Sequence, residues 1–373
     1  MTIQGTKGPT ILIENPQSNQ VNLRGLKLSH EGDPDKSPES PDQQAEQKQK
    51  ADTPKSPEEK EKKVLEYLHL FNKLDFSEKS DPVILLKTGQ LTLKECSIDL
   101  SLLASSPQSI ALATILELNT TAHIEECHFI GSESFDTLGV VVKGANLVMH
   151  KTKIQRFKSG GMMIALGLQD KLNINISESF VENNSSFGIM AKGVNSEFPI
   201  IEDCQIENTL GYGLLIADKN RGALIRNTIK GHEENGILVI NADPRIDNNL
   251  IAGNGDNGIQ VEAAHSTPTE PQISYNKILG NKGNGVRVGG SMCKPVFKSN
   301  KIEDNEKAGI AVERGAEPII VRNDIKGNRG EGIFLEEDCD AKVKSNNIGE
   351  NGKANIPLDG KKVENTTSLP TNK

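Results

Sequence analysis

The chain has no tryptophan and only three tyrosines, and aromatic residues make up 3% of its 373 residues. Aromatic rings are the usual stacking surfaces for sugars, so this scarcity counts against a polysaccharide-processing enzyme. No apolar run approaches the roughly 20 residues that a membrane-spanning helix needs, so we expect no membrane partner. The first fifteen residues lack the basic and apolar segments of a secretion signal.

Cysteine is also scarce, with five residues in the whole chain. Their number is odd and their spacing fits neither a disulfide framework nor a metal site, which favours a reducing compartment. We therefore expect no bound metal and no cofactor. The formal net charge of -8 gives no reason to expect attraction to nucleic acid or to anionic lipid.

One pattern dominates the second half of the chain, and its fullest form is P-x-I-x-x-N-x-I-x-x-N-x-x-x-G-I-x-V. It occurs as PQISYNKILGNKGNGVRV (271–288), PVFKSNKIEDNEKAGIAV (295–312) and PIIVRNDIKGNRGEGIFL (318–335). A repeat of about 24 residues with short apolar strands is typical of a stacked β solenoid. The sequence predicts an all-β protein, a right-handed parallel β-helix of about twelve coils, roughly 55 Å long at about 4.8 Å per coil.

The repeat can be aligned on the asparagine that precedes its second strand. We predict that these asparagines stack inward and hydrogen-bond from coil to coil, as in cross-β stacks. The predicted ladder consists of Asn227, Asn249, Asn276, Asn300, Asn323 and Asn346. Toward the N-terminus small residues take the same position, among them Cys96, Cys127 and Cys204, which we expect to be buried. The glycine before each G-I-x-V strand, such as Gly285, is predicted to have positive φ at a corner.

The pattern also predicts the domain organisation. Residues 1–30 form the first coil, and residues 82–352 form the main β-helix. Between them, residues 31–81 are rich in proline, serine and charge, which predicts a disordered insertion with a short helix near 58–74. The tail, 353–373, loses the pattern. Four Ser/Thr-Pro pairs in the insertion are candidate phosphorylation sites, at Ser37, Ser40, Thr53 and Ser56.

The units from about 88 to 351 resemble the right-handed parallel β-helix repeats of pectate-lyase-like folds. Segments such as ANLVMHKTKIQRFKSGGMMI and RGALIRNTIKGHEENGILVI are most similar to an intracellular branch, the F-box-only and Shc-binding β-helix proteins. This resemblance implies a cytoplasmic protein, with association to the cytoskeleton or a cilium. It also implies other proteins as partners, in a multi-subunit assembly such as an axoneme or spindle.

The third residue of each G-I-x-V strand is expected to face solvent, and on five successive coils it is apolar. The predicted strip consists of Val141, Met163, Met190, Leu215 and Leu238. An exposed apolar strip of this length is typical of a protein-binding surface. A second interpretation is that the helix near 58–74 covers the strip with Leu65, Leu68 and Phe71, and the two interpretations are compatible if that helix is displaceable.

A column of carboxylates is the main sign of catalysis. Glu262, Glu313 and Glu336 each follow a G-I-x-V strand, and Arg287 and Arg314 are expected nearby. Glu313 and Glu336, on adjacent coils, have a predicted spacing of about 5 Å, compatible with a retaining glycosidase. The alternative is a solvated acidic stripe. Two glycine-rich segments, 253–258 and 280–285, lack the Lys-Ser/Thr of a phosphate-binding loop and are interpreted as corner turns.

We therefore predict a non-catalytic scaffold or adaptor that presents a rigid β-helix face to protein partners, with no catalytic residue and no small-molecule substrate. The alternative function is a carbohydrate-active enzyme, similar to a pectate lyase or a glycosidase.

Overall fold

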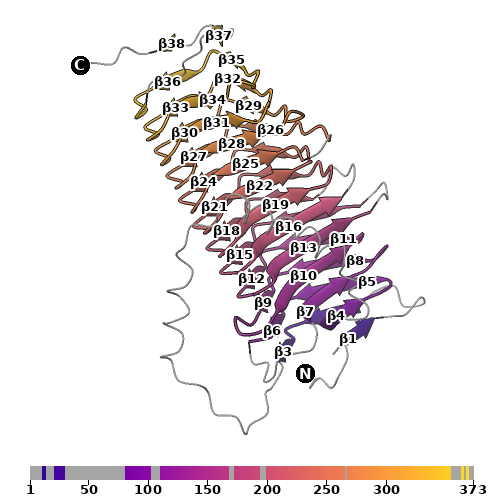
Figure 1. The fold of residues 1–373 in the computed structure, drawn as a ribbon. Helices are drawn as coiled ribbons and strands as arrows, with labels where there is room; N and C mark the ends of the chain where they lie inside the picture. The colour runs from indigo at the N-terminus through magenta and orange to yellow at the C-terminus, as the bar shows by residue number, and fades with distance from the viewer. Residues whose placement is uncertain are drawn as a thin grey trace, which may run out of the picture.

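Three parallel sheets, which we call A, B and C, run the length of the molecule. The computed structural model describes residues 11–13, 21–29, 80–101, 110–167, 172–193, 199–264, 267–353, 363–364 and 367–368. Each coil up to β36 contributes one strand to each sheet, and each strand pairs in parallel with its counterpart on the next coil. Figure 1 shows the coils stacked along one axis, from β1–β3 at one end to β36–β38 at the other.

Sheet A contains β1 (Ile11–Ile13), β4 (Ser80–Leu86), β7 (Ile110–Leu116), β10 (Thr137–Lys143), β13 (Gly160–Leu166), β16 (Phe187–Gly193), β19 (Tyr212–Ala217), β22 (Ile237–Ile240), β25 (Ile259–Glu262), β28 (Val286–Gly289), β31 (Ile310–Glu313) and β34 (Ile333–Leu335). Sheet B contains β2 (Val21–Arg24), β5 (Gln90–Lys94), β8 (Thr121–Glu125), β11 (Asn146–His150), β14 (Ile174–Ser177), β17 (Ile200–Glu202), β20 (Ala223–Ile225), β23 (Arg245–Asp247), β26 (Gln272–Ser274), β29 (Val296–Lys298), β32 (Ile319–Val321), β35 (Lys342–Lys344) and β37 (Val363–Glu364). Sheet C contains β3 (Lys27–Ser29), β6 (Ser97–Asp99), β9 (His128–Ile130), β12 (Lys153–Gln155), β15 (Phe180–Glu182), β18 (Gln205–Glu207), β21 (Thr228–Lys230), β24 (Leu250–Ala252), β27 (Lys277–Leu279), β30 (Lys301–Glu303), β33 (Asp324–Lys326), β36 (Asn347–Gly349) and β38 (Thr367–Ser368).

The predicted fold class, an all-β parallel β-helix, is therefore confirmed. Sheet A has 12 strands, and sheets B and C have 13 each, because β37 and β38 extend them past the last predicted coil. The first coil is separated from the rest by the insertion, since β3 ends at Ser29 and β4 begins at Ser80. The helix near 58–74 and the four candidate phosphorylation sites lie outside the described residues. Among the described residues no helix is long and apolar enough to cross a membrane.

The predicted asparagine ladder is confirmed at the corner between sheets B and C. Each side chain donates from Nδ2 to Oδ1 of the next asparagine, at 3.0 Å in all five steps from Asn227 to Asn346. The same Oδ1 atoms also accept the backbone N–H of the preceding ladder residue, at 2.8–2.9 Å. Nearer the N-terminus, the hydroxyls of Thr152 and Ser179 accept that backbone N–H instead.

The prediction for the glycine before each G-I-x-V strand is wrong, because Gly285 and its equivalents do not have positive φ. A Cβ on Gly285 would lie 2.5 Å from Ile302 Cγ2 and 2.7 Å from the carbonyl oxygen of Gly309 on the next coil. Close approach of stacked backbones therefore excludes a side chain here. Positive φ occurs instead at the residue before each ladder position, from Glu95 to Ser345, with values of 47–57°.

The interior of the solenoid is a single hydrophobic cluster that runs from Leu26 to Ile348. Most inward residues of the repeat, such as Ile273, Ile278 and Val288, are fully buried in it, and Leu335 near the C-terminal end is partly buried. Because strand side chains alternate, the residues between them leave the opposite face of each sheet. The outer face of sheet A is where the predicted strip and the predicted carboxylates both lie.

Candidate functional site

The outer face of sheet A changes from apolar to charged at β25. Strand pairing aligns one row of outward residues along the axis, with Leu215 beside Leu238, then Gln260, then Arg287. In the next row Glu262 aligns with Gly289, and Gly289 with Glu313. One sheet therefore presents an apolar half and a charged half to the same side of the molecule.

The apolar half corrects the prediction of a solvent-exposed strip. Val141, Met163, Met190, Leu215 and Leu238 do leave the outer face, but they are 0–2% exposed. They form a second hydrophobic cluster, separate from the interior, together with Ile115, Leu138, Phe187, Tyr212 and Ile240. Buried side chains offer no free surface to a protein partner, so the predicted binding strip is withdrawn. The proposed cover by residues 58–74 concerns a segment outside the described residues.

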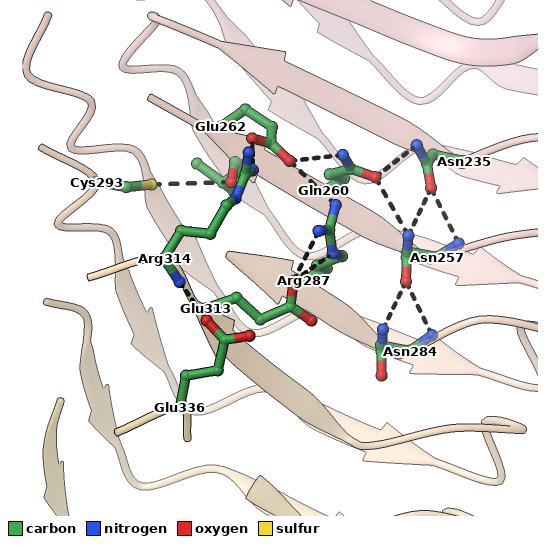
Figure 2. A network of polar contacts seen from close by, with 11 residues as sticks. Asn235, Asn257, Gln260, Glu262, Asn284, Arg287, Cys293, Glu313, Arg314 and Glu336 are labelled. Carbon is green, nitrogen blue, oxygen red and sulfur yellow. Dashed lines mark hydrogen bonds and ion pairs between the residues drawn. The ribbon is translucent and has the colours of Figure 1, made fainter. Parts of the chain in front are cut away.

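The charged half brings together all five residues of the predicted carboxylate column. Arg287 donates from Nε and Nη2 to Glu313 Oε2, at 3.0 and 2.6 Å, and from Nη1 to Glu262 Oε1, at 3.1 Å. Arg314 Nη2 donates to Glu262 Oε2, and the Arg314 backbone N–H donates to Glu336 Oε2 at 2.6 Å. Figure 2 shows these side chains converging over neighbouring strands.

An amide network fixes the other side of Glu262. Gln260 Nε2 donates to Glu262 Oε1 at 2.8 Å, and Gln260 Oε1 accepts from Nδ2 of both Asn235 and Asn257. Asn257 also bonds to Asn284, so these asparagines form a further short ladder next to the charged cluster (Figure 2). Asn257 and Asn284 belong to the glycine-rich segments interpreted as corner turns. Glu262 is thus held by Gln260 as well as by Arg287 and Arg314.

Charge pairing dominates the electrostatics of this cluster. Burial acts to lower the pKa of Arg287, but the hydrogen bond and charge of Glu313 and the charge of Glu262 outweigh it, so the pKa is raised above its ordinary value. The guanidinium therefore stays charged at any physiological pH. Side-chain exposure is 15% for Glu262, 20% for Glu313 and 27% for Arg287, but 47% for Arg314. Arg314 is thus the most accessible of these four side chains.

Sequence reasoning missed Gly289, which lies between the two glutamates in register. A Cβ there would lie 2.5 Å from Arg314 Nη2 and 2.9 Å from Arg314 Nε. The absent side chain is therefore what allows Arg314 to lie across the strand and reach Glu262. Sequence reasoning also missed a second internal asparagine ladder, although the consensus contains its asparagine five residues after the first: Asn254, Asn281, Asn305, Asn328 and Asn351.

Cysteines and acidic groups elsewhere give weaker candidates. All five cysteines are buried, as predicted for the three ladder positions, and burial raises the pKa of Cys127, Cys204 and Cys293 to about 12. Among the described residues, the ligand atoms of Glu336, Asp338 and Cys339 lie within 4.8 Å of one another. Burial also raises the pKa of the Cys339 thiol.

The fold and the cluster define a parallel β-helix with a charged patch on one sheet. Residues 82–251 and 241–369 match the family model described as right handed beta helix region, so the chain belongs to this family and the predicted hand is confirmed. A search of curated proteins by sequence found no match. The predicted placement near the F-box-only and Shc-binding branch is not tested by these comparisons.

Several solved structures have the same fold. The A-module of mannuronan C-5 epimerase AlgE4 from Azotobacter vinelandii has a TM-score of 0.62 at 15% identity, covering 77% of this chain and 89% of that chain. The A-module of AlgE6 from the same organism has a TM-score of 0.58 at 14% identity, covering 79% and 89%. A mutant of the periplasmic alginate epimerase AlgG has a TM-score of 0.53 at 10% identity, covering 70% and 72%.

These comparisons overturn the prediction of a non-catalytic scaffold. The similar structures are carbohydrate-active enzymes by name, which agrees with the alternative function and not with an adaptor. The scarcity of aromatic residues does not by itself exclude a carbohydrate-active enzyme, because charged side chains can bind an acidic sugar without stacking surfaces.

Proposed function

We propose that this protein binds an acidic polysaccharide at the charged half of sheet A's outer face and acts on its uronate residues. The observation that supports the proposal is the convergence of Arg287, Arg314, Glu262, Glu313 and Glu336 over β25, β28 and β31. The names of the similar structures, mannuronan and alginate epimerases, favour a uronate polymer over a neutral one.

The stacking of coils suits a polymer. Adjacent coils are about 4.8 Å apart, which is close to the length of one pyranose unit in an extended chain. A polysaccharide that lies along the solenoid axis can therefore meet the equivalent position on successive coils with successive sugars. Glu262, Gly289 and Glu313 are three such positions, because strand pairing places them in one row.

The cluster contains the groups needed to remove a proton next to a carboxylate. A glutamate carboxylate accepts the proton from the sugar carbon that bears the carboxyl group. The electron pair left behind moves onto that carboxyl group, whose negative charge an arginine stabilises. Return of a proton from the opposite face inverts the carbon, whereas departure of the neighbouring glycosidic oxygen with its bonding electrons cleaves the chain and leaves a double bond.

The base is expected to be Glu313 or Glu336. Glu262 has both carboxylate oxygens in ion pairs, whereas Glu313 and Glu336 each use only Oε2 among the described residues. A carboxylate with a free oxygen can accept a proton without first breaking an ion pair. Glu313 is the more enclosed of these two candidates, because Arg287 holds it over the sheet.

The test is incubation of the purified protein with mannuronan, alginate or polygalacturonate in deuterated water. We expect deuterium at the carbon next to the carboxylate, observed by NMR, with either a changed sugar composition or an unsaturated product. Glu313→Gln should reduce the rate strongly. Glu317→Gln is the matched control, because Glu317 is exposed and its salt bridge is to Lys294 on the surface. Absence of exchange and of product with every uronate polymer would overturn the proposal.

Three predictions from the sequence are independent of this test. The kinship with the F-box-only and Shc-binding branch, the cytoplasmic location with association to the cytoskeleton or a cilium, and the presence of protein partners stay predictions. Co-purification from native cells, followed by mass spectrometry and microscopy of the tagged protein, checks the last two.

A further inference from the structure

The two arginines of the cluster are held in different ways. Arg287 uses Nε, Nη1 and Nη2 in hydrogen bonds to Glu313 and Glu262. Glu262 in turn has both oxygens occupied, by Arg287, Gln260 and Arg314. Arg287 and Glu262 therefore form a closed and mostly buried frame. A ligand carboxylate that approached Arg287 would have to displace Glu313 first.

Arg314 makes fewer side-chain hydrogen bonds than Arg287 and is more exposed. Of its side-chain nitrogens only Nη2 is bonded, to Glu262, so Nε and Nη1 have no partner among the residues that the structure describes. The side chain is 47% exposed. A guanidinium carries five N–H donors in a planar fork, so most of the donors of Arg314 remain available to a ligand.

The backbone conformation of Arg314 and the neighbouring strand β28 together fix the position of its side chain. The residue has φ of 55°, in the left-handed region that arginine rarely adopts. Its N–H is fixed by Glu336, and its guanidinium lies across β28 in the space that a side chain at Gly289 would fill. The same backbone conformation recurs at many corners of the solenoid, including Arg226 and Arg322, so what distinguishes Arg314 is its contact with Glu262 and its position over Gly289.

From this geometry we infer that Arg314, seated over Gly289, is the residue that selects substrates by binding the uronate carboxylate. Arg287 is a positioning residue, which holds Glu313 and Glu262 in place. Glu313 directly precedes Arg314 in the chain and Glu336 accepts its backbone N–H, so both candidate bases lie beside this arginine. The inference rests on the proposed function and assigns its specificity to one side chain.

A guanidinium distinguishes a uronate from a neutral sugar by the geometry of its hydrogen bonds to the carboxylate. Guanidinium and carboxylate form two parallel N–H···O bonds, a geometry that a hydroxymethyl group cannot reproduce and that lysine, a point charge, reproduces only in part. Loss of one such charge-assisted contact weakens binding by about 10- to 100-fold. Arg314→Gln should therefore weaken binding of an oligouronate by that factor, and Arg314→Lys by less.

The experiment measures binding of an oligouronate and of its carboxyl-reduced, neutral counterpart by calorimetry. The proteins are the wild type, Arg314→Gln, Arg314→Lys and Gly289→Ala. Arg322→Gln is the matched control, because Arg322 is also an exposed arginine with positive φ, at the corner between sheets B and C. Thermal melts check that each variant is folded. Arg314→Gln is expected to fold, because the side chain of Arg314 is half exposed.

We expect Arg314→Gln and Gly289→Ala to lose affinity for the oligouronate, and neither to change the weaker binding of the neutral oligosaccharide. Arg322→Gln should bind like the wild type. If the wild type binds the oligouronate and folded Arg314→Gln binds it equally well, the inference is wrong while the proposed function stands. If the wild type binds no oligouronate at all, both the proposed function and the inference are overturned.

Discussion

His232 should make the protein sensitive to acid, because it is a histidine built into an asparagine ladder. It precedes Asn254 in the second ladder, and its backbone N–H donates to Asn254 Oδ1 at 3.2 Å. Its ring is buried, with Nδ1 accepting the Thr209 N–H at 3.1 Å and Nε2 donating to the Ile206 carbonyl at 3.0 Å. Both ring nitrogens are thus matched to a neutral imidazole protonated on Nε2, and a second proton on Nδ1 would face a donor.

The size of the effect follows from the pKa. Burial lowers the pKa of His232 from 6.5 to about 4, and the hydrogen bond to Ile206 offsets this only in part. Between these two values the unfolded chain binds a proton that the folded protein does not, so stability rises with pH. The contribution is complete above pH 6.5 and is lost as pH falls toward 4. At about 1.4 kcal/mol per pH unit, the total loss is about 3 kcal/mol.

The perturbation that isolates this contribution is His232→Asn. Asparagine continues the ladder, because the amide oxygen of Asn184 already accepts a backbone N–H, from Phe157, on an earlier coil. Urea unfolding of the two proteins is compared between pH 5 and pH 8. Carboxylates destabilise both proteins in acid, so the difference between the two curves reports the histidine. We expect the wild type to lose about 2 kcal/mol relative to the variant between pH 8 and pH 5.

An NMR titration of the folded protein provides an independent measurement. The His232 ring should stay neutral, with its proton on Nε2, down to about pH 5. A midpoint near the ordinary value of 6.5, or an unfolding difference that does not change with pH, would refute the reasoning.

Three further predictions concern the packing of the coils. Asn300→Leu should lower stability by about 3 kcal/mol or more, seen in a thermal melt, because it removes from the interior the oxygen that accepts both the backbone N–H and Nδ2 of Asn276. Gly285→Ala should destabilise by several kcal/mol in the same assay, whereas Gly349→Ala should not, since a Cβ at Gly349 meets nothing within 4 Å; equal melts would contradict the stacked-backbone explanation. Cys204, with its pKa raised to about 12 by burial, should resist thiol reagents until the protein is unfolded, and rapid labelling of the native protein would show that this coil opens.

The repeat in the sequence was enough to predict the fold and the inward residues. Its period, its alternating isoleucines and its asparagines determine each coil locally, and identical coils can only bury their apolar residues against one another. The first ladder, with Asn300 as an example, was therefore predictable residue by residue. The second ladder was present in the same consensus and could have been read from it.

The role of the glycine before each G-I-x-V strand depended on the tertiary structure. A glycine in a sequence indicates either positive φ or close approach of another chain segment, and only the distance to the next coil distinguishes them. Gly285 has no positive φ, and it is required because the Gly309 carbonyl lies too close for a Cβ. Positive φ was the predicted cause for this glycine, whereas the actual cause is the close approach of the next coil.

The outer faces were the part that the sequence left undetermined. Alternation shows that Met190 and Arg287 leave the same face of sheet A, but burial and partners depend on what packs there. Met190 is buried in a second cluster, and Arg287 is held by two glutamates from neighbouring coils. Local periodicity determines which side of a strand a residue occupies. Contacts between residues on different coils, 22 or more positions apart, decide whether that side is solvent, a second core or a binding site.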